Sequence, residues 1–121
     1  MKIYTTCFEN AFKLPDSILP FSIALKPPKN WNGFQYRALA PKEEFFYKWR
    51  DNRNNEYYTE HFNSEVLEKL DAKTVVEDLQ MIAKGYDSIA LVCYEQPTEF
   101  CHRHLIAEWL QKDGFEVVEF T

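Results

Sequence analysis

Glycine is scarce in this chain, with only three among 121 residues, at Gly33, Gly85 and Gly114. They are far apart, so the sequence has no glycine-rich loop of the kind that wraps phosphate in P-loop and dinucleotide-binding proteins. A Cys-x5-Arg phosphatase loop is also excluded, because position 99, where an arginine would follow Cys93, is Glu99.

Long hydrophobic runs and paired cysteines are missing as well. No window approaches the ~20 consecutive apolar residues of a membrane span, and residues 1–6 lack the apolar stretch of a secretory signal. The three cysteines, Cys7, Cys93 and Cys101, are an odd number, which does not suit a disulfide framework. We therefore expect reduced thiols in a soluble, intracellular, cytoplasmic protein that does not contact a membrane.

The composition is that of a packed globular protein. Apolar residues make up 45% of the chain and charged residues 27%, and 121 residues fit a single domain, 1–121. At this length about two thirds of the chain's surface can be buried, so neither a metal nor a disulfide is needed for stability. Aromatic residues reach 17%, more than so small a core needs, and we expect some to line a surface or pocket.

The net charge of −5 conceals an uneven distribution. Nine Lys or Arg and six Asp or Glu precede position 59, whereas five Lys or Arg and thirteen Asp or Glu follow it, so the two parts carry +3 and −8. Most of the basic excess lies in residues 26–53. This asymmetry can mark a site for an anionic partner. A solvated surface of mixed charge with no partner is the alternative that we favour, and both interpretations stay open.

Apolar patterning predicts strands, a long loop and three helices in the first 85 residues. Pro41 followed by two acidic residues indicates a helix start, and the polar run 51–55 indicates its end. Asp71 is a candidate cap for a later helix, and Gly85 a candidate stop. The predicted elements are strands at 2–6 and 21–25, a loop at 27–41, and helices from 41, over 56–70 and from 71.

The C-terminal third predicts a strand–helix–strand unit. The nearly continuous apolar run 88–93 is typical of a central parallel strand. A polar loop at 94–99, a helix ended by Gly114 and an alternating strand at 115–120 follow it. We therefore expect an α/β fold, a compact three-layer structure with a mostly parallel sheet and helices on its faces.

Reactive side chains are densest in residues 93–104, between this strand and its helix. Ligands of open α/β sheets bind beyond the carboxyl ends of the strands, which is where this loop is predicted to lie. A thiol in the first helical turn beside a histidine and an arginine should have a stabilised thiolate. Cys101 is therefore the candidate nucleophile, His102 a candidate base or hydrogen-bond donor, and Glu95 the acid that orients either His102 or Arg103.

The same segment contains candidate binding residues. Arg103 is a candidate fork for phosphate or carboxylate, and the predicted ligand-binding set is completed by Cys93, Thr6 and Tyr94. A purely structural explanation stays open, in which Cys101 is a buried apolar residue, His102 caps the loop and Arg103 pairs with Glu95 or Glu99.

Metal binding is a further alternative, since Cys93, Cys101, His102 and His104 are all zinc-ligand types. Structural zinc sites usually open with a shorter cysteine spacing, and we do not expect the adjacent Cys101 and His102 to reach one ion. We therefore predict no metal and no cofactor.

Two short motifs carry a family resemblance. The run 90–95 ending in Cys-Tyr-Glu, followed by Cys-His-Arg at 101–103 and the helix 104–110, resembles the signature of the family called domain of unknown function 488. Weaker matches extend over the chain, at 3–6, 38–41, Tyr58, Phe62 and 66–67. The resemblance implies a compact α/β fold and a site built from Cys93, Glu95, Cys101, His102 and Arg103, but no activity. Larger members carry Gly-His after the first strand, where this chain has Thr6 and Cys7.

Three functional hypotheses follow from these residues. In the first, the site at the strand ends binds or processes a phosphate-bearing small molecule or a nucleotide. In the second, the chain is a nucleic-acid-binding accessory protein that uses the basic, aromatic segment 26–53, although Phe45, Phe46 and Trp49 have the spacing of core residues. The third is covalent thiol catalysis at Cys101. Whether the protein is an enzyme is left open.

Overall fold

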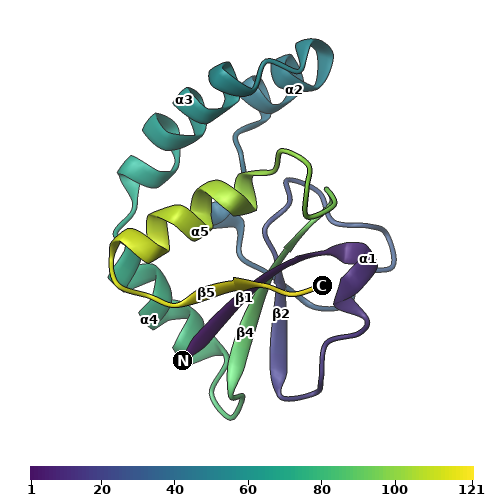
Figure 1. The fold of residues 1–121 in the computed structure, drawn as a ribbon, viewed down its shortest axis with the longest axis vertical. Coiled ribbons are helices and arrows are strands. Elements are labelled where there is room, and N and C mark those ends of the chain that lie inside the picture. Colours follow the sequence, from purple (N-terminus) through teal and green to yellow (C-terminus); the bar gives the residue numbers. More distant parts are fainter.

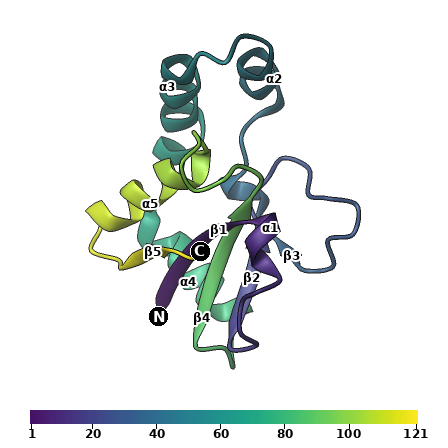
Figure 2. The same cartoon turned by 45° about the vertical axis from the view of Figure 1, so that its right-hand side comes forward.

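The computed structural model describes residues 1–121 and contains a five-stranded, all-parallel sheet in the order β3-β2-β4-β1-β5 (Figure 1; β3 is labelled in Figure 2). The predicted α/β class is thus confirmed. The strands are β1 (Lys2–Cys7), β2 (Ile18–Ser22), β3 (Phe34–Gln35), β4 (Ser88–Cys93) and β5 (Val117–Glu119). The helices are α1 (Phe8–Ala11), α2 (Glu43–Asn52), α3 (Asn55–Glu65), α4 (Ala72–Ile82) and α5 (His102–Lys112), and single 3₁₀ turns occupy Arg37–Leu39 and Leu67–Lys69.

Strand β4 is the centre of the sheet. It pairs with β1 on one side and β2 on the other, and all six of its residues are buried. Its apolar run is therefore explained by cover on both faces, as the sequence predicts. Ile89 and Leu91 belong to the main core under the helices, whereas Ala90 and Val92 form a small cluster covered by α1 and the segment around Trp31. The second face thus carries only a one-turn helix.

The predicted second strand is displaced. The structure places β2 at Ile18–Ser22 rather than at 21–25, so Pro20 lies inside the strand. Proline lacks the backbone N–H needed for a ladder on both sides. It is tolerated here because β3 pairs only with Phe21 and Ser22, which leaves the other edge of β2 free at Pro20. The predicted loop 27–41 also contains the short β3, and helix α1 was not predicted.

Helix boundaries largely follow the predicted signals. Asp71 accepts a hydrogen bond from the backbone N–H of Thr74 and caps α4, and Gly85 has φ = 98° after its end. The helix predicted over 56–70 is shorter, because α3 ends at Glu65 and a 3₁₀ turn follows. None of these helices has the length and apolar character needed to cross a lipid bilayer.

Helices α2 and α3 stand beyond the carboxyl ends of the strands (Figures 1 and 2). The loop from β4 to α5 lies beneath them in both views. This arrangement brings the basic, aromatic part of the chain next to the segment that is rich in reactive side chains.

Candidate functional site

A cavity of about 190 Å³ lies where these two parts of the chain meet. One wall comes from Lys26, Pro41 and helix α2, which contributes Phe46, Tyr47, Trp49 and Arg50. Further lining comes from Tyr58 of α3 and from residues of the loop between β4 and α5. Five predicted site residues line it, namely Cys93, Tyr94, Glu95, Cys101 and His102, whereas Arg103 and Thr6 do not.

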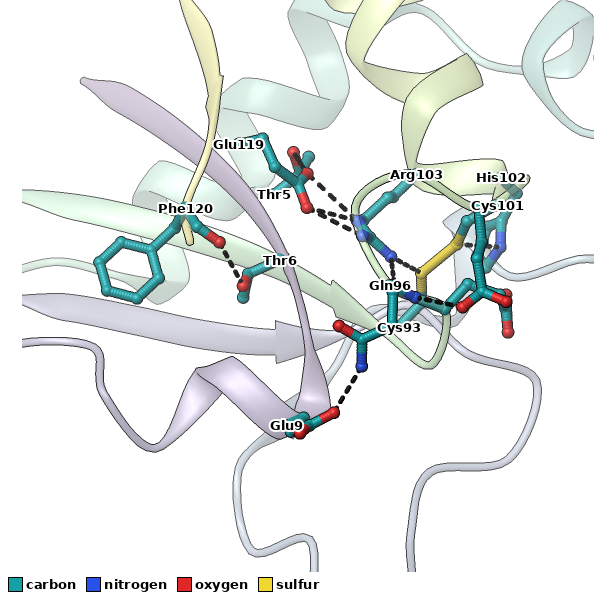
Figure 3. A network of polar contacts seen from close by, with 12 residues as sticks. Thr5, Thr6, Glu9, Cys93, Gln96, Cys101, His102, Arg103, Glu119 and Phe120 are labelled. Atoms are coloured by element: carbon teal, nitrogen blue, oxygen red, sulfur yellow. Dashed lines mark hydrogen bonds and ion pairs between the residues drawn. A yellow bond between two sulfur atoms is a disulfide. The ribbon is translucent and has the colours of Figure 1, made fainter.

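Cys93 and Cys101 are joined by a disulfide at this cavity (Figure 3). This corrects the expectation of reduced thiols. The odd number of cysteines is explained by Cys7, which is free and buried in β1. Cys93 is the last residue of β4 and Cys101 is the N-cap residue of α5. The short loop between these elements therefore brings two cysteines that are separated in the sequence close together in space.

Arg103 lies beneath the cavity and is fully buried. Its Nη1 donates to the Sγ of Cys93 (3.0 Å) and to the carbonyl oxygen of Glu95 (2.7 Å). Its Nε and Nη2 donate to the carboxylate of Glu119 in β5, at 3.2 and 2.8 Å (Figure 3). Thr5 Oγ1 also donates to that carboxylate (2.6 Å). The guanidinium is therefore held by protein groups, and it orients the loop and the Cys93 sulfur.

Glu119 is the residue that sequence reasoning missed. The predicted ion-pair partners of Arg103 were Glu95 and Glu99, but Glu95 offers its backbone carbonyl and the carboxylate comes from the last strand. Only the parallel pairing of β5 with β1 brings Glu119 beside the start of α5, and no local sequence signal reveals that pairing.

His102 is buried, and its two ring nitrogens have different partners. Nε2 lies 2.7 Å from the carbonyl oxygen of Ile23. A carbonyl can only accept, so Nε2 carries the proton and the lone pair is on Nδ1. Nδ1 lies 3.9 Å from the Sγ of Cys101. Burial lowers the pKa of His102 from 6.5 to about 4, so the ring is neutral at physiological pH.

Glu95 is the carboxylate of the cavity. Burial raises its pKa, an effect that the positive charge of Arg103 opposes. Burial and the charge of Glu95 in turn raise the pKa of Tyr58 across the cavity. The neighbouring Tyr94 is exposed, and its hydroxyl donates to the carbonyl oxygen of Lys26 (2.6 Å), which ties the loop to the basic segment.

Thr6 lies apart from the cavity. It is buried in β1, and its Oγ1 donates to the carbonyl oxygen of Phe120 (2.8 Å; Figure 3). The loop has a separate tie to α1, where Gln96 Nε2 donates to the carboxylate of Glu9 (2.5 Å). The first contact therefore joins β1 to the C-terminal residues, and the second joins the loop to α1.

The basic, aromatic segment is only partly a surface. Phe45 and Trp49 are buried in the core, with 1% and 5% of their surface exposed. Arg50 lies over the ring of Tyr47 (4.6 Å) and Arg53 over that of Trp49 (4.4 Å). The core interpretation of Phe45 and Trp49 therefore holds, while Tyr47 and the two arginines stay accessible.

Three potential metal-ligand atoms, two sulfurs and one imidazole nitrogen, also lie close together at the disulfide. The side chains of Cys93, Cys101 and His102 place their ligand atoms within 4.8 Å of one another, and all three residues are buried. Adjacent Cys101 and His102 therefore place their ligand atoms close together, although from the sequence we did not expect them to reach one ion. His104 lies outside this group.

Fold and site together define a class: an α/β protein with an open parallel sheet and a pocket of cysteine, histidine and aromatic residues beyond its strand ends. Residues 15–114 match the family DUF488-N3a, described as the active DUF488-N3 subclade. The chain belongs to this family, which confirms the resemblance to domain of unknown function 488. No curated protein and no solved structure matches the chain.

Proposed function

We propose that the cavity binds a phosphate-bearing small molecule and that a nucleotide is the ligand class that fits best. The observation that carries this proposal is the composition of one cavity, which combines aromatic rings, two cationic side chains and one carboxylate. The base of a nucleotide can stack on the aromatic rings, its amino group can donate to the carboxylate, and its phosphate can pair with the cationic side chains.

The size of the cavity suits a nucleobase. A protein cavity of about 150 Å³ accommodates benzene, so about 190 Å³ admits one ring system but not a whole nucleotide. The sugar and phosphate would then lie outside, at the mouth. Aromatic side chains contribute about 1–3 kcal/mol for each base that stacks on them, and Tyr47, Tyr58 and Tyr94 are among the rings available here.

The polar side chains of the cavity match the two ends of such a ligand, the base and the phosphate. Glu95 can accept hydrogen bonds from the exocyclic amino group of a base, which favours adenine, guanine or cytosine over uracil. Lys26 and Arg50 are exposed at the mouth and supply positive charge for the phosphate. Arg103, predicted from sequence for that role, instead supports the loop from below.

Thermal unfolding in the presence of adenosine, cytidine and uridine monophosphates and of inorganic phosphate tests the proposal. A ligand at one hundred times its Kd stabilises a protein by about 2.7 kcal/mol. We expect stabilisation by the two amino-bearing nucleotides, less by uridine monophosphate and least by phosphate alone. No stabilisation by any nucleotide would contradict the proposal.

Paired variants locate the phosphate contact. We expect the double variant K26A/R50A to weaken nucleotide binding at least tenfold, because both cations line the cavity. The matched control K29A/R37A removes two exposed cations from the same segment that do not line it. Equal loss of binding in both double variants would show nonspecific attraction rather than a site.

Nucleic acid is the competing ligand class for the same surface. A strand that inserts one base would use the cavity and would track Arg50 and Arg53 with its backbone phosphates. Single-stranded oligonucleotides serve as a second arm of the titration. Binding that exceeds that of the mononucleotides and weakens steeply with salt would favour the nucleic-acid alternative.

Cys101, His102 and Glu95 are the catalytic residues we propose for any processing of the ligand. All three line the cavity. A nucleophilic role for Cys101 belongs to the reduced protein, because its sulfur is bonded to Cys93 in this structure.

A further inference from the structure

We infer that Cys93, Cys101 and His102 form a binding site for a thiophilic divalent ion such as Zn²⁺ when the Cys93–Cys101 disulfide is reduced. The inference goes beyond nucleotide binding and does not depend on it. Its basis is the meeting of two sulfur atoms and one imidazole nitrogen within 4.8 Å, contributed by the end of β4 and the start of α5.

The orientation of His102 is the first supporting observation. A metal-ligating histidine usually donates its other ring N–H to a carbonyl or carboxylate, which fixes the tautomer and the ring plane. His102 has this arrangement, because Nε2 donates to the carbonyl oxygen of Ile23. The unprotonated Nδ1 is then directed toward the sulfurs, with Cys101 Sγ 3.9 Å away.

The backbone separation of the two cysteines is the second observation. Their Cα atoms lie 7.7 Å apart, beyond the roughly 4.4–6.8 Å at which disulfide-bonded Cα atoms usually lie. The backbone positions of the two cysteines therefore leave room for the two sulfur atoms to move apart around an ion. The connecting loop is held by hydrogen bonds of its own, among them that from Arg103 to the carbonyl of Glu95.

Charge at the site favours thiolates. Arg103 Nη1 donates to the Sγ of Cys93 (3.0 Å), and a thiolate is a stronger acceptor than a thiol. The positive charge of Arg103 is matched by Glu119, so two thiolates and one divalent ion add no net charge to this buried region. Two thiolates and a neutral imidazole are a donor set typical of zinc.

The position of the cluster makes it an open site. All three residues line the cavity, so a tetrahedral ion would hold three protein ligands and direct its fourth position into the pocket. Three protein ligands and one exchangeable position characterise catalytic zinc sites rather than structural ones. The fourth ligand would be water or an oxygen or sulfur atom of a molecule in the pocket.

The disulfide and the ion exclude each other. A phosphine reductant supplies two electrons to the disulfide. One water molecule supplies the oxygen of the resulting phosphine oxide and the two protons of the two thiols. The ion then binds both sulfurs and displaces those two protons. A two-electron oxidant such as diamide would re-form the disulfide and release the ion.

The experiment is a Co²⁺ titration of the full chain, reduced with a phosphine and desalted without oxygen. We expect uptake of one equivalent with a thiolate-to-cobalt charge-transfer band, which Zn²⁺ abolishes. The disulfide form should take up no ion at this site. C93S, C101S and H102Q should each weaken binding at least tenfold, and H102Q retains a donor for the carbonyl of Ile23.

Matched controls separate the site from nonspecific ligation. C7S removes the free buried cysteine and H61A removes an imidazole on α3, and both should bind Co²⁺ as the unaltered chain does. Circular dichroism establishes that each protein is folded. Where a variant does not fold, ¹¹³Cd NMR of the unaltered reduced protein reports the ligands directly, and we expect the shift of a site with two sulfurs.

Three results would overturn the inference. They are no uptake by the reduced, folded protein, undiminished charge transfer in C93S or C101S, and a cadmium shift without sulfur ligation. Failure of nucleotide binding would affect none of these readouts, so the two proposals fail separately.

Discussion

Arg103 is the residue on which the geometry of the pocket depends. It joins the sulfur of Cys93, the loop carbonyl of Glu95 and the carboxylate of Glu119, which come from three separate parts of the chain. Its side chain is fully buried, whereas 24% of the Glu119 side chain is exposed. Removing one partner of a buried pair leaves the other without compensation.

We therefore expect Arg103→Met to lower the free energy of unfolding by about 3 kcal/mol, the lower end of the range for breaking a buried ion pair. Urea denaturation measures the change, and E116Q, which alters an exposed carboxylate just before β5, should have little effect. A loss below about 1 kcal/mol would mean that the network contributes little to stability.

His102 makes stability depend on pH. Burial lowers its pKa to about 4 in the folded protein, against 6.5 for an ordinary histidine. Between these values the unfolded chain binds a proton that the folded chain does not, so stability decreases as pH falls from 6.5 toward 4.

In the disulfide form we expect a loss of about 3 kcal/mol over this interval from His102 alone. H102Q should lack this component, whereas H61A, which removes a more exposed histidine, should retain it. Urea denaturation at a series of pH values measures both. The same pH dependence in H102Q and the unaltered chain would contradict the assignment.

At the level of elements, helix α3 positions one wall of the pocket through Tyr58. Its first turn is capped by Asn54, whose side-chain oxygen accepts from the backbone N–H of Tyr57 (3.1 Å). The preceding Arg53 has φ = 55°, and the chain passes from α2 to α3 within a few residues. The cap therefore determines where α3 starts.

Replacing Asn54 with alanine should cost about 1 kcal/mol of stability, because it removes the cap. Asn54→Asp should retain most of it, since aspartate caps as well as asparagine. N63A, on the exposed side of the same helix, controls for loss of an asparagine. Thermal denaturation compares the three, and equal stability of N54A and N54D would contradict the role of the cap.

Element prediction from sequence succeeded where the signal is local. The apolar run of β4, the cap at Asp71 and the stops at Gly85 and Gly114 are properties of a few adjacent residues, and the structure confirms them. The second strand was misplaced because the tolerance of Pro20 depends on how short β3 is. That length is not a property of residues near Pro20.

At the level of the whole molecule, the structure shows where the basic and the acidic parts of the sequence meet. The basic, aromatic segment packs beside the loop 94–100, so Lys26 and Arg50 line the same cavity as Glu95 and the cysteine pair. Five predicted site residues line this cavity, namely Cys93, Tyr94, Glu95, Cys101 and His102, because they lie close together in and beside one loop. The disulfide and the partner of Arg103 depend on tertiary packing and escaped prediction.

We propose that the ligand site is the cavity between the two charged parts of the chain. Backbone amide NMR of the ¹⁵N-labelled protein during titration with adenosine monophosphate tests it most directly. We expect saturable shifts concentrated at five cavity residues, with Lys29 and Arg37 unaffected. The five are Lys26, Tyr47, Arg50, Glu95 and His102. Shifts spread over the basic surface, or no shifts at these amides, would contradict it.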